Sequence, residues 1–128
     1  MSTRSRSLRC LQLRALRLSI RHWEGVCLVV ERAIAQGLPA DVDVSDTGCE
    51  CCRVLKDSIL GFCIACPIYE YTGYTSCMDT PWSAVGDALS LYHCRLWSVE
   101  AGRSLLGACL LEYFYLLFVY EALRRERV

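Results

Sequence analysis

Six cysteines fall between Cys49 and Cys77, and their spacing constrains this chain more than any other feature. Four of them form two C-x-x-C pairs, Cys49 with Cys52 and Cys63 with Cys66. Two residues between thiolates let a tight turn direct both sulfurs at one ion, and two such turns complete a tetrahedral zinc site. We therefore expect a structural zinc ion bound by Cys49, Cys52, Cys63 and Cys66.

The ligand set and the metal both have alternatives. Cys51 and Cys77 are alternate ligands. Ten residues separate the two C-x-x-C pairs, whereas zinc ribbons have about 15 to 20 residues between their pairs. An iron–sulfur cluster would use the same sulfurs, because Cys66-Pro67 is similar to the end of ferredoxin cluster loops. Disulfides are a further alternative, because the ten cysteines of the chain are an even number. Reduced thiols that bind no metal are the last alternative.

The residues before this module predict a long amphipathic helix. Its apolar side chains recur at alternating steps of three and four, which places them on one face: Leu13, Leu16, Ile20, Trp23, Cys27, Val30 and Ile34. Gly37 and Pro39 are expected to end this helix. The Arg-rich, acid-free composition of residues 1–23 is also typical of an organellar transit peptide, which is the alternative to a folded helix.

Two more helices are predicted after the module. Thr80-Pro81 suits a helix start, because Thr caps helix N-termini and Pro fits the first helical position. Gly102 is the expected break between the second helix and the third. The fold class is therefore mainly α, with about three helices around a cysteine-rich, metal-binding loop module. One domain over 1–128 divides into a basic arm over 1–7, a first helix over 8–37, the cysteine module over 40–80, a second helix over 81–101 and a third helix over 103–125.

The third helix is apolar on nearly every side. Its run of sixteen residues over 105–120 contains one charge, Glu112. This run is shorter than the about 20 apolar residues that a membrane span requires, so we expect no membrane span. A helix of this kind has to be covered on more than one side. We expect it to contact a protein partner or a second copy of the chain through Leu116, Phe118 and Val119.

Four other candidates for chemistry have simpler interpretations. Cys27 and Cys109 lie on apolar helix faces, where a free cysteine behaves as a small buried hydrophobe. The two histidines, His22 and His93, each stand next to a helix aromatic, and a packed or surface imidazole is favoured over a metal ligand.

The order of these elements resembles a group of short phage and prophage proteins of unknown function. The resemblance covers about residues 13–123 and depends on Ser19-Ile-Arg-His-Trp-Glu24, Cys49-x-x-Cys52, Cys63-x-x-Cys66-Pro67-Ile68, Thr72-Gly73, Cys77 and Thr80-Pro81-Trp82. It implies a compact, cysteine-centred helical domain with no known activity. The added Cys51 and the more apolar third helix depart from that pattern, and the second departure favours a surface that faces a partner.

The balance of charge and the absence of known catalytic motifs argue against two classes of function. The 14 basic residues balance the 14 acidic ones, which argues against a general polyanion binder. No H-E-x-x-H, G-x-S-x-G or dinucleotide-binding motif is present, so an enzyme is disfavoured. We expect a non-catalytic, zinc-stabilised interaction or regulatory protein, of a kind that phages encode, acting on a host or phage macromolecule in the bacterial cytoplasm. The alternatives are a nucleic-acid-binding zinc-knuckle protein, stacking bases on Tyr69, Tyr71, Tyr74 and Trp82, and an iron–sulfur redox or sensor protein.

Overall fold

The structure, a computed structural model, describes residues 3–44 and 81–126, with side chains described from residue 8 onward. These ranges contain three helices and no strand, so the predicted mainly α class is confirmed. The helices are α1 (Thr3–Gln36), α5 (Trp82–Cys94) and α6 (Val99–Arg125). The predicted cysteine module lies outside the described residues.

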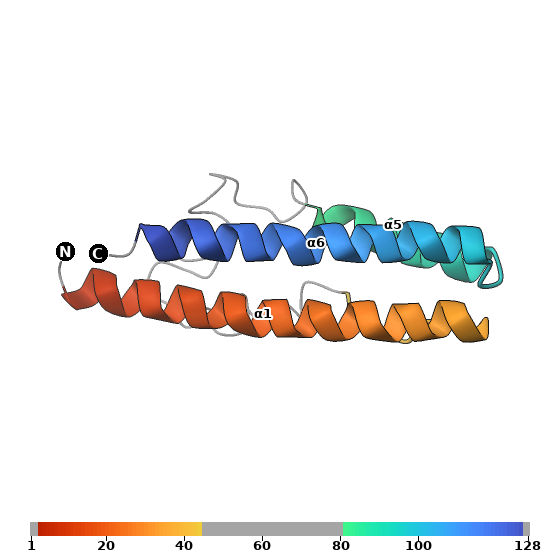
Figure 1. Ribbon diagram of the computed structural model, residues 1–128, viewed down its shortest axis with the longest axis horizontal. Coiled ribbons are helices and arrows are strands. Elements are labelled where there is room, and N and C mark those ends of the chain that lie inside the picture. Colours follow the sequence, from red (N-terminus) through yellow and green to blue (C-terminus); the bar gives the residue numbers. More distant parts are fainter. Residues whose placement is uncertain (1–2, 45–80, 127–128) are drawn as a thin grey trace.

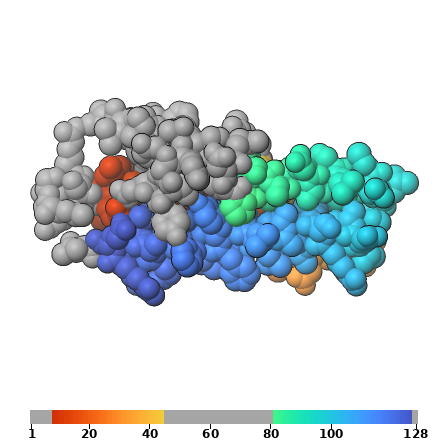
Figure 2. Space-filling view, turned by 90° about the horizontal axis from the view of Figure 1, so that it is seen from above, coloured from red at the N-terminus to blue at the C-terminus, as the bar shows by residue number. Residues whose placement is uncertain are grey.

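The two long helices α1 and α6 lie side by side and run in opposite directions (Figure 1). Both ends of the chain are therefore at the same end of the molecule, and the short turn between α5 and α6 is at the other end. The helix α5 packs against the first half of α6. In the space-filling view, α6 forms one long open side of the molecule (Figure 2).

The apolar face predicted for the first helix is the face that α1 buries. Five of its seven members are buried and two are half-buried: Leu13, Leu16, Trp23, Cys27 and Val30, then Ile20 and Ile34. Burying an aliphatic side chain of this size contributes about 1.5–3 kcal/mol. Arg14, Arg17 and Arg21 are exposed on the outer face. The helix begins at Thr3 rather than at residue 8, so most of the expected basic arm is helical.

The predicted end of the first helix is confirmed at Gly37. This glycine has a φ of +65°, a conformation that residues with a Cβ adopt at a cost. Its N–H donates to the carbonyl of Ile34 at 3.3 Å, and the N–H of Leu38 donates to the carbonyl of Ala33 at 3.0 Å. This pair of bonds is the Schellman arrangement, which satisfies carbonyls that the helix end leaves open.

After this turn, the chain passes back along α1 and is anchored by three side chains. The Tyr92 hydroxyl donates to the carbonyl of Leu38. Nε2 of His22 lies 2.9 Å from the carbonyl oxygen of Asp43. Nε1 of Trp82 donates to the carbonyl of Val44 at 2.9 Å. His22 thus acts as a structural anchor, in line with the packed imidazole expected from the sequence.

The second helix is shorter than predicted. The expected helix over 81–101 ends at Cys94. Leu96 and Val99, which continue the apolar spacing of this segment, are therefore not on its buried face, and Leu96 is 78% exposed. Thr80, the predicted cap, lies outside the described residues, and α5 begins directly after Pro81.

Two residues with positive φ angles cause this early end. Leu96 has a φ of 51° and Trp97 has a φ of 62°. The N–H of Leu96 donates to the carbonyl of His93 at 3.2 Å, and the N–H of Trp97 donates to the carbonyl of Tyr92 at 2.9 Å. This turn repeats the hydrogen bonds found at Gly37, with a leucine where a glycine is usual.

The third helix begins four residues earlier than predicted, at Val99 instead of 103. Ser98 caps it, because its Oγ accepts from the N–H of Ala101 at 3.3 Å. Gly102, the expected break, therefore lies inside the first turn of α6 and is buried. Its role is close packing, since a Cβ built there would lie 2.6 Å from Cγ1 of Ile34.

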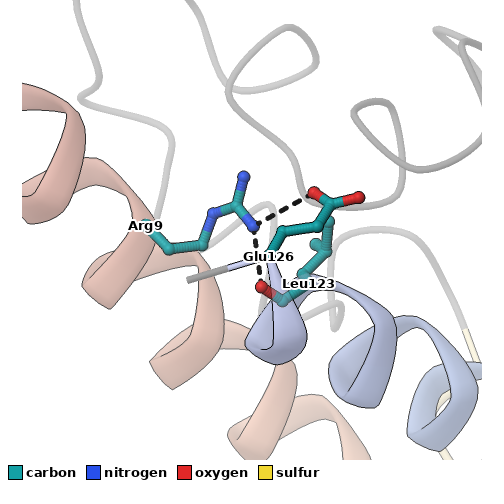
Figure 3. A network of polar contacts seen from close by, with 3 residues as sticks. All are labelled: Arg9, Leu123 and Glu126. Atoms are coloured by element: carbon teal, nitrogen blue, oxygen red, sulfur yellow. Dashed lines mark hydrogen bonds and ion pairs between the residues drawn. The ribbon is translucent and has the colours of Figure 1, made fainter. Parts of the chain in front are cut away.

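Arg9 joins the first turns of α1 to the last turn of α6 (Figure 3). Nη1 of Arg9 donates to the carbonyl of Leu123 at 2.9 Å and lies 3.7 Å from Oε2 of Glu126. Arg9 is buried although it is charged. Its guanidinium therefore satisfies a helix-end carbonyl that would otherwise need water.

Candidate functional site

The predicted metal ligands all lie outside the described residues: Cys49, Cys52, Cys63 and Cys66, with the alternates Cys51 and Cys77. Within residues 3–44 and 81–126, no group of three or more His, Cys, Asp or Glu side chains is placed to hold a metal ion. His93 is exposed on α5. The zinc site accordingly stays a prediction from the sequence.

Two free cysteines face each other's helices in the core. Cys27 of α1 and Cys109 of α6 are both buried, and Glu112 is buried one turn further along α6. Burial raises the pKa of the Cys109 thiol to about 12, and the nearby Cys27 and Glu112 add to the effect. Burial, with a contribution from Glu31, also raises the pKa of Cys27. Both thiols are protonated at neutral pH, so they are core residues, as the sequence indicated, rather than nucleophiles.

The predicted partner surface on the third helix is wrong at two of its three residues. Leu116 is 3% exposed and Val119 is fully buried, because both belong to the α6 face that packs on α1. Phe118 is on the opposite side and is 64% exposed. Of these three residues, only Phe118 is therefore exposed enough to contact another molecule while the described helices stay packed.

A row of exposed residues precedes Phe118 along α6. Leu111 is 64% exposed and Phe114 is 59% exposed. Gly107 continues the row by one turn and is also exposed. The steps between these residues are four, three and four, so they lie on one face of the helix. We call Gly107, Leu111, Phe114 and Phe118 the α6 stripe, which is about 16 Å long at 1.5 Å per residue.

Charged residues lie at both ends of the α6 stripe. Glu100 and Arg103 precede it, and Glu121 and Arg125 follow it, all on the same side of the helix. Glu121 accepts a hydrogen bond from Arg124 at 2.9 Å within the chain. The α6 stripe is therefore a short apolar surface with a polar boundary along the helix axis.

Sequence reasoning missed the α6 stripe because the helix is apolar all round. Its buried face and its exposed face both have steps of three and four, so the spacing alone cannot tell which one faces the core. Gly107 is the one signal in the sequence that points to this exposed face as a contact surface. A glycine in the middle of a helix lowers stability unless it allows close packing.

The helix α6 also has the length and composition of a membrane span. It is the only described helix that passes this test, and 28% of its most apolar 18-residue window is buried inside the molecule. Core helices of water-soluble proteins pass the same test. The expectation that the chain has no membrane span consequently stays a prediction.

Comparisons with protein-family models, with curated proteins and with solved structures found no match to this chain. The resemblance to short phage proteins therefore also stays a prediction. The function has to be argued from the residues themselves.

Proposed function

We propose that this chain is a non-catalytic helical interaction protein that binds its partner through the α6 stripe. The observation that carries this proposal is the exposure of Leu111, Phe114 and Phe118 on one face of a well-packed helix. Single exposed apolar residues are ordinary, whereas an aligned group bounded by polar residues marks a contact surface. Covering each of these side chains would contribute about 1.5–3 kcal/mol.

The titratable groups of the described residues support a binding role. The two buried thiols have raised pKa values and are protonated at neutral pH. His22 is engaged with a backbone carbonyl, and His93 is on the surface. Among the described residues, neither histidine makes a hydrogen bond to Cys27 or Cys109, so these groups do not form the nucleophile and base pair that covalent catalysis uses.

Membrane association is a second candidate, favoured by the length and composition of α6. The pairing of α1 with α6 argues against it, because the outer face of α1 is charged. Moving the pair into a bilayer would bury Arg17, Arg21 and Arg32, each at about 2.5–3.5 kcal/mol near the bilayer centre. Separating α6 from α1 and inserting α6 alone would instead expose the apolar face of α1 to water. We therefore favour a protein partner in water.

The predicted zinc site is a separate proposal that rests on the sequence. Four cysteine thiolates form a closed shell, so zinc at Cys49, Cys52, Cys63 and Cys66 would stabilise the fold without offering a substrate position. This role is consistent with a binding protein in the cytoplasm, where thiols stay reduced.

Site-specific photo-cross-linking tests the proposed surface. A benzophenone side chain replaces Phe118 in one variant and Leu28 in the control, since Leu28 is 50% exposed on α1. We expect discrete protein adducts from position 118 in cells that make the protein, and few from position 28. Lipid adducts from position 118 would favour the membrane candidate. Equal labelling at both positions would contradict a specific surface.

A further inference from the structure

We infer that the occupant of the α6 stripe is a second copy of this chain, bound in the antiparallel direction. This inference rests on the proposed function and names the partner. The steps of four, three and four in the α6 stripe match the a and d positions of a heptad, the spacing by which two helices pack side chains between one another. The same spacing continues outward to Glu100 and Arg125.

The sizes of the side chains define one register. When two copies of α6 lie antiparallel with the symmetry axis between Leu111 and Phe114, Leu111 is level with Phe114 of the partner subunit. Gly107 is then level with Phe118 of the partner subunit. A Cβ built on Gly107 meets no atom within 4 Å, so the chain itself does not crowd this position. The smallest residue of the α6 stripe thus lies opposite one of the largest.

The charges agree with the same register. Glu100 becomes level with Arg125 of the partner subunit, and Arg103 lies within one residue of the level of the partner subunit's Glu121. A two-fold axis between two antiparallel helices places the same side of the α6 stripe of both copies next to each other. Arg103 and Glu121 both lie on one side of the α6 stripe, so each can approach the other residue in the second copy. Both ends of the contact therefore pair opposite charges, and symmetry repeats each pair.

The charges also select the direction of the second copy. In a parallel pair, Glu100 would face Glu100 of the partner subunit, and Arg125 would face the partner's Arg125. Like charges opposite each other are unfavourable and select against that arrangement. The antiparallel pair is the one arrangement that covers the apolar residues and also satisfies the charges at both ends.

Sedimentation equilibrium of the full chain tests this dimer. We expect the unchanged protein to dimerise with rising concentration. The Gly107→Leu variant should be monomeric, because its side chain would occupy the place of the partner subunit's Phe118. The matched control is Gly25→Leu on α1, where a Cβ also meets no atom within 4 Å. It should dimerise like the unchanged protein, and circular dichroism should show the same helix content in all three.

Charge reversal tests the register. Glu100→Arg and Arg125→Glu should each raise the dimer dissociation constant about tenfold, since every reversal affects two symmetric pairs. The double variant should recover the original constant, because it exchanges the charges within each pair. A control reversal, Arg32→Glu on the outer face of α1, should have no effect.

The outcomes separate this inference from the proposed function. A protein that stays monomeric at the highest concentration, or a Gly107→Leu variant that still dimerises, would overturn the antiparallel dimer. If the purified protein is monomeric but position 118 still cross-links to a different protein in cells, the α6 stripe binds another partner and only the dimer is wrong. If position 118 gives no specific protein adduct at all, both fail.

Discussion

Gly102 of α6 lies so close to Ile34 of α1 that a Cβ on the glycine would be 2.6 Å from Cγ1 of the isoleucine. The same Cβ would lie 3.2 Å from Cε1 of Tyr92. The absence of a side chain at this point lets α6 approach both neighbouring elements. Gly107, five residues further along, has no such neighbour. Two glycines of one helix thus have different structural roles.

Alanine substitutions should separate these roles. Gly102→Ala should lower the free energy of unfolding by about 1–3 kcal/mol, because the added methyl group has no space in the core. At protein concentrations where the chain is monomeric, Gly107→Ala should raise it by up to about 1 kcal/mol, since alanine favours the helix and the added Cβ meets no atom within 4 Å. Urea denaturation measures both values. If both substitutions stabilise the chain, the close packing of Gly102 against Ile34 is incorrect.

Replacing Leu96 by glycine should stabilise the protein. A left-handed conformation costs a residue with a Cβ about 1–2 kcal/mol, and Leu96 adopts one at a φ of 51°. The side chain is 78% exposed, so its removal loses little burial. We expect a gain of about 1 kcal/mol in thermal or urea denaturation. The control, Leu91→Gly inside α5, should lose about the same amount.

Two glutamate substitutions should distinguish the α6 stripe from the core. Leu116→Glu should unfold the chain, because it would bury a carboxylate in the contact with α1. Phe118→Glu should keep the helix content and abolish association, since its side chain is 64% exposed and belongs to the α6 stripe. Circular dichroism and light scattering report the two properties. A folded, monomeric Leu116→Glu variant would contradict the placement of Leu116.

Alkaline pH should weaken the fold through the buried thiols. Burial raises the pKa of Cys109 to about 12 from an ordinary value of 9.0. Between these values the folded state keeps a proton that the unfolded state has lost. The contribution of the protonated Cys109 thiol to the free energy of unfolding is therefore fully present below pH 9. Between pH 9 and about 12 it falls by up to about 1.4 kcal/mol per pH unit.

Two variants isolate this effect in denaturation curves between pH 9 and 11. Cys109→Ala should have the shallower pH dependence. Cys94→Ala should keep the original slope, because Cys94 is exposed. Equal slopes in all three proteins would mean that Cys109 does not titrate in this way.

The predicted zinc site gives a test that depends only on the sequence. Cys63→Ser and Cys66→Ser should each lower stability by several kcal/mol, and a chelator should do the same to the unchanged protein. Elemental analysis of protein purified without oxygen should find one zinc per chain. Cys109→Ala should cost only a core truncation. Equal tolerance of all three substitutions would count against metal binding.

The first helix could be predicted because local rules and packing agree there. Its apolar spacing identifies the buried face, and Gly37 supplies the left-handed residue that ends it. The end of α5 could not be predicted, since Leu96 occupies the position that glycine usually takes. Gly102 is the converse case, because a glycine at that position predicts a break in the helix, whereas here it allows close packing against Ile34.

The surface of the third helix needed the structure. Leu116 and Phe118 have similar hydrophobicity, and only the position of α1 decides which one is covered. The α6 stripe is therefore a property of the packed chain rather than of the helix alone.

The contact between Arg9 and Leu123 joins residues that are 114 positions apart. Forming it requires closure of a long loop, which makes helical proteins of this kind fold more slowly than bundles with local contacts. During synthesis, α1 leaves the ribosome well before α6 exists, while α5 and α6 can pair as neighbours. The apolar face of α1 is thus exposed until translation is nearly complete, and this interval is when a chaperone would protect the chain from aggregation.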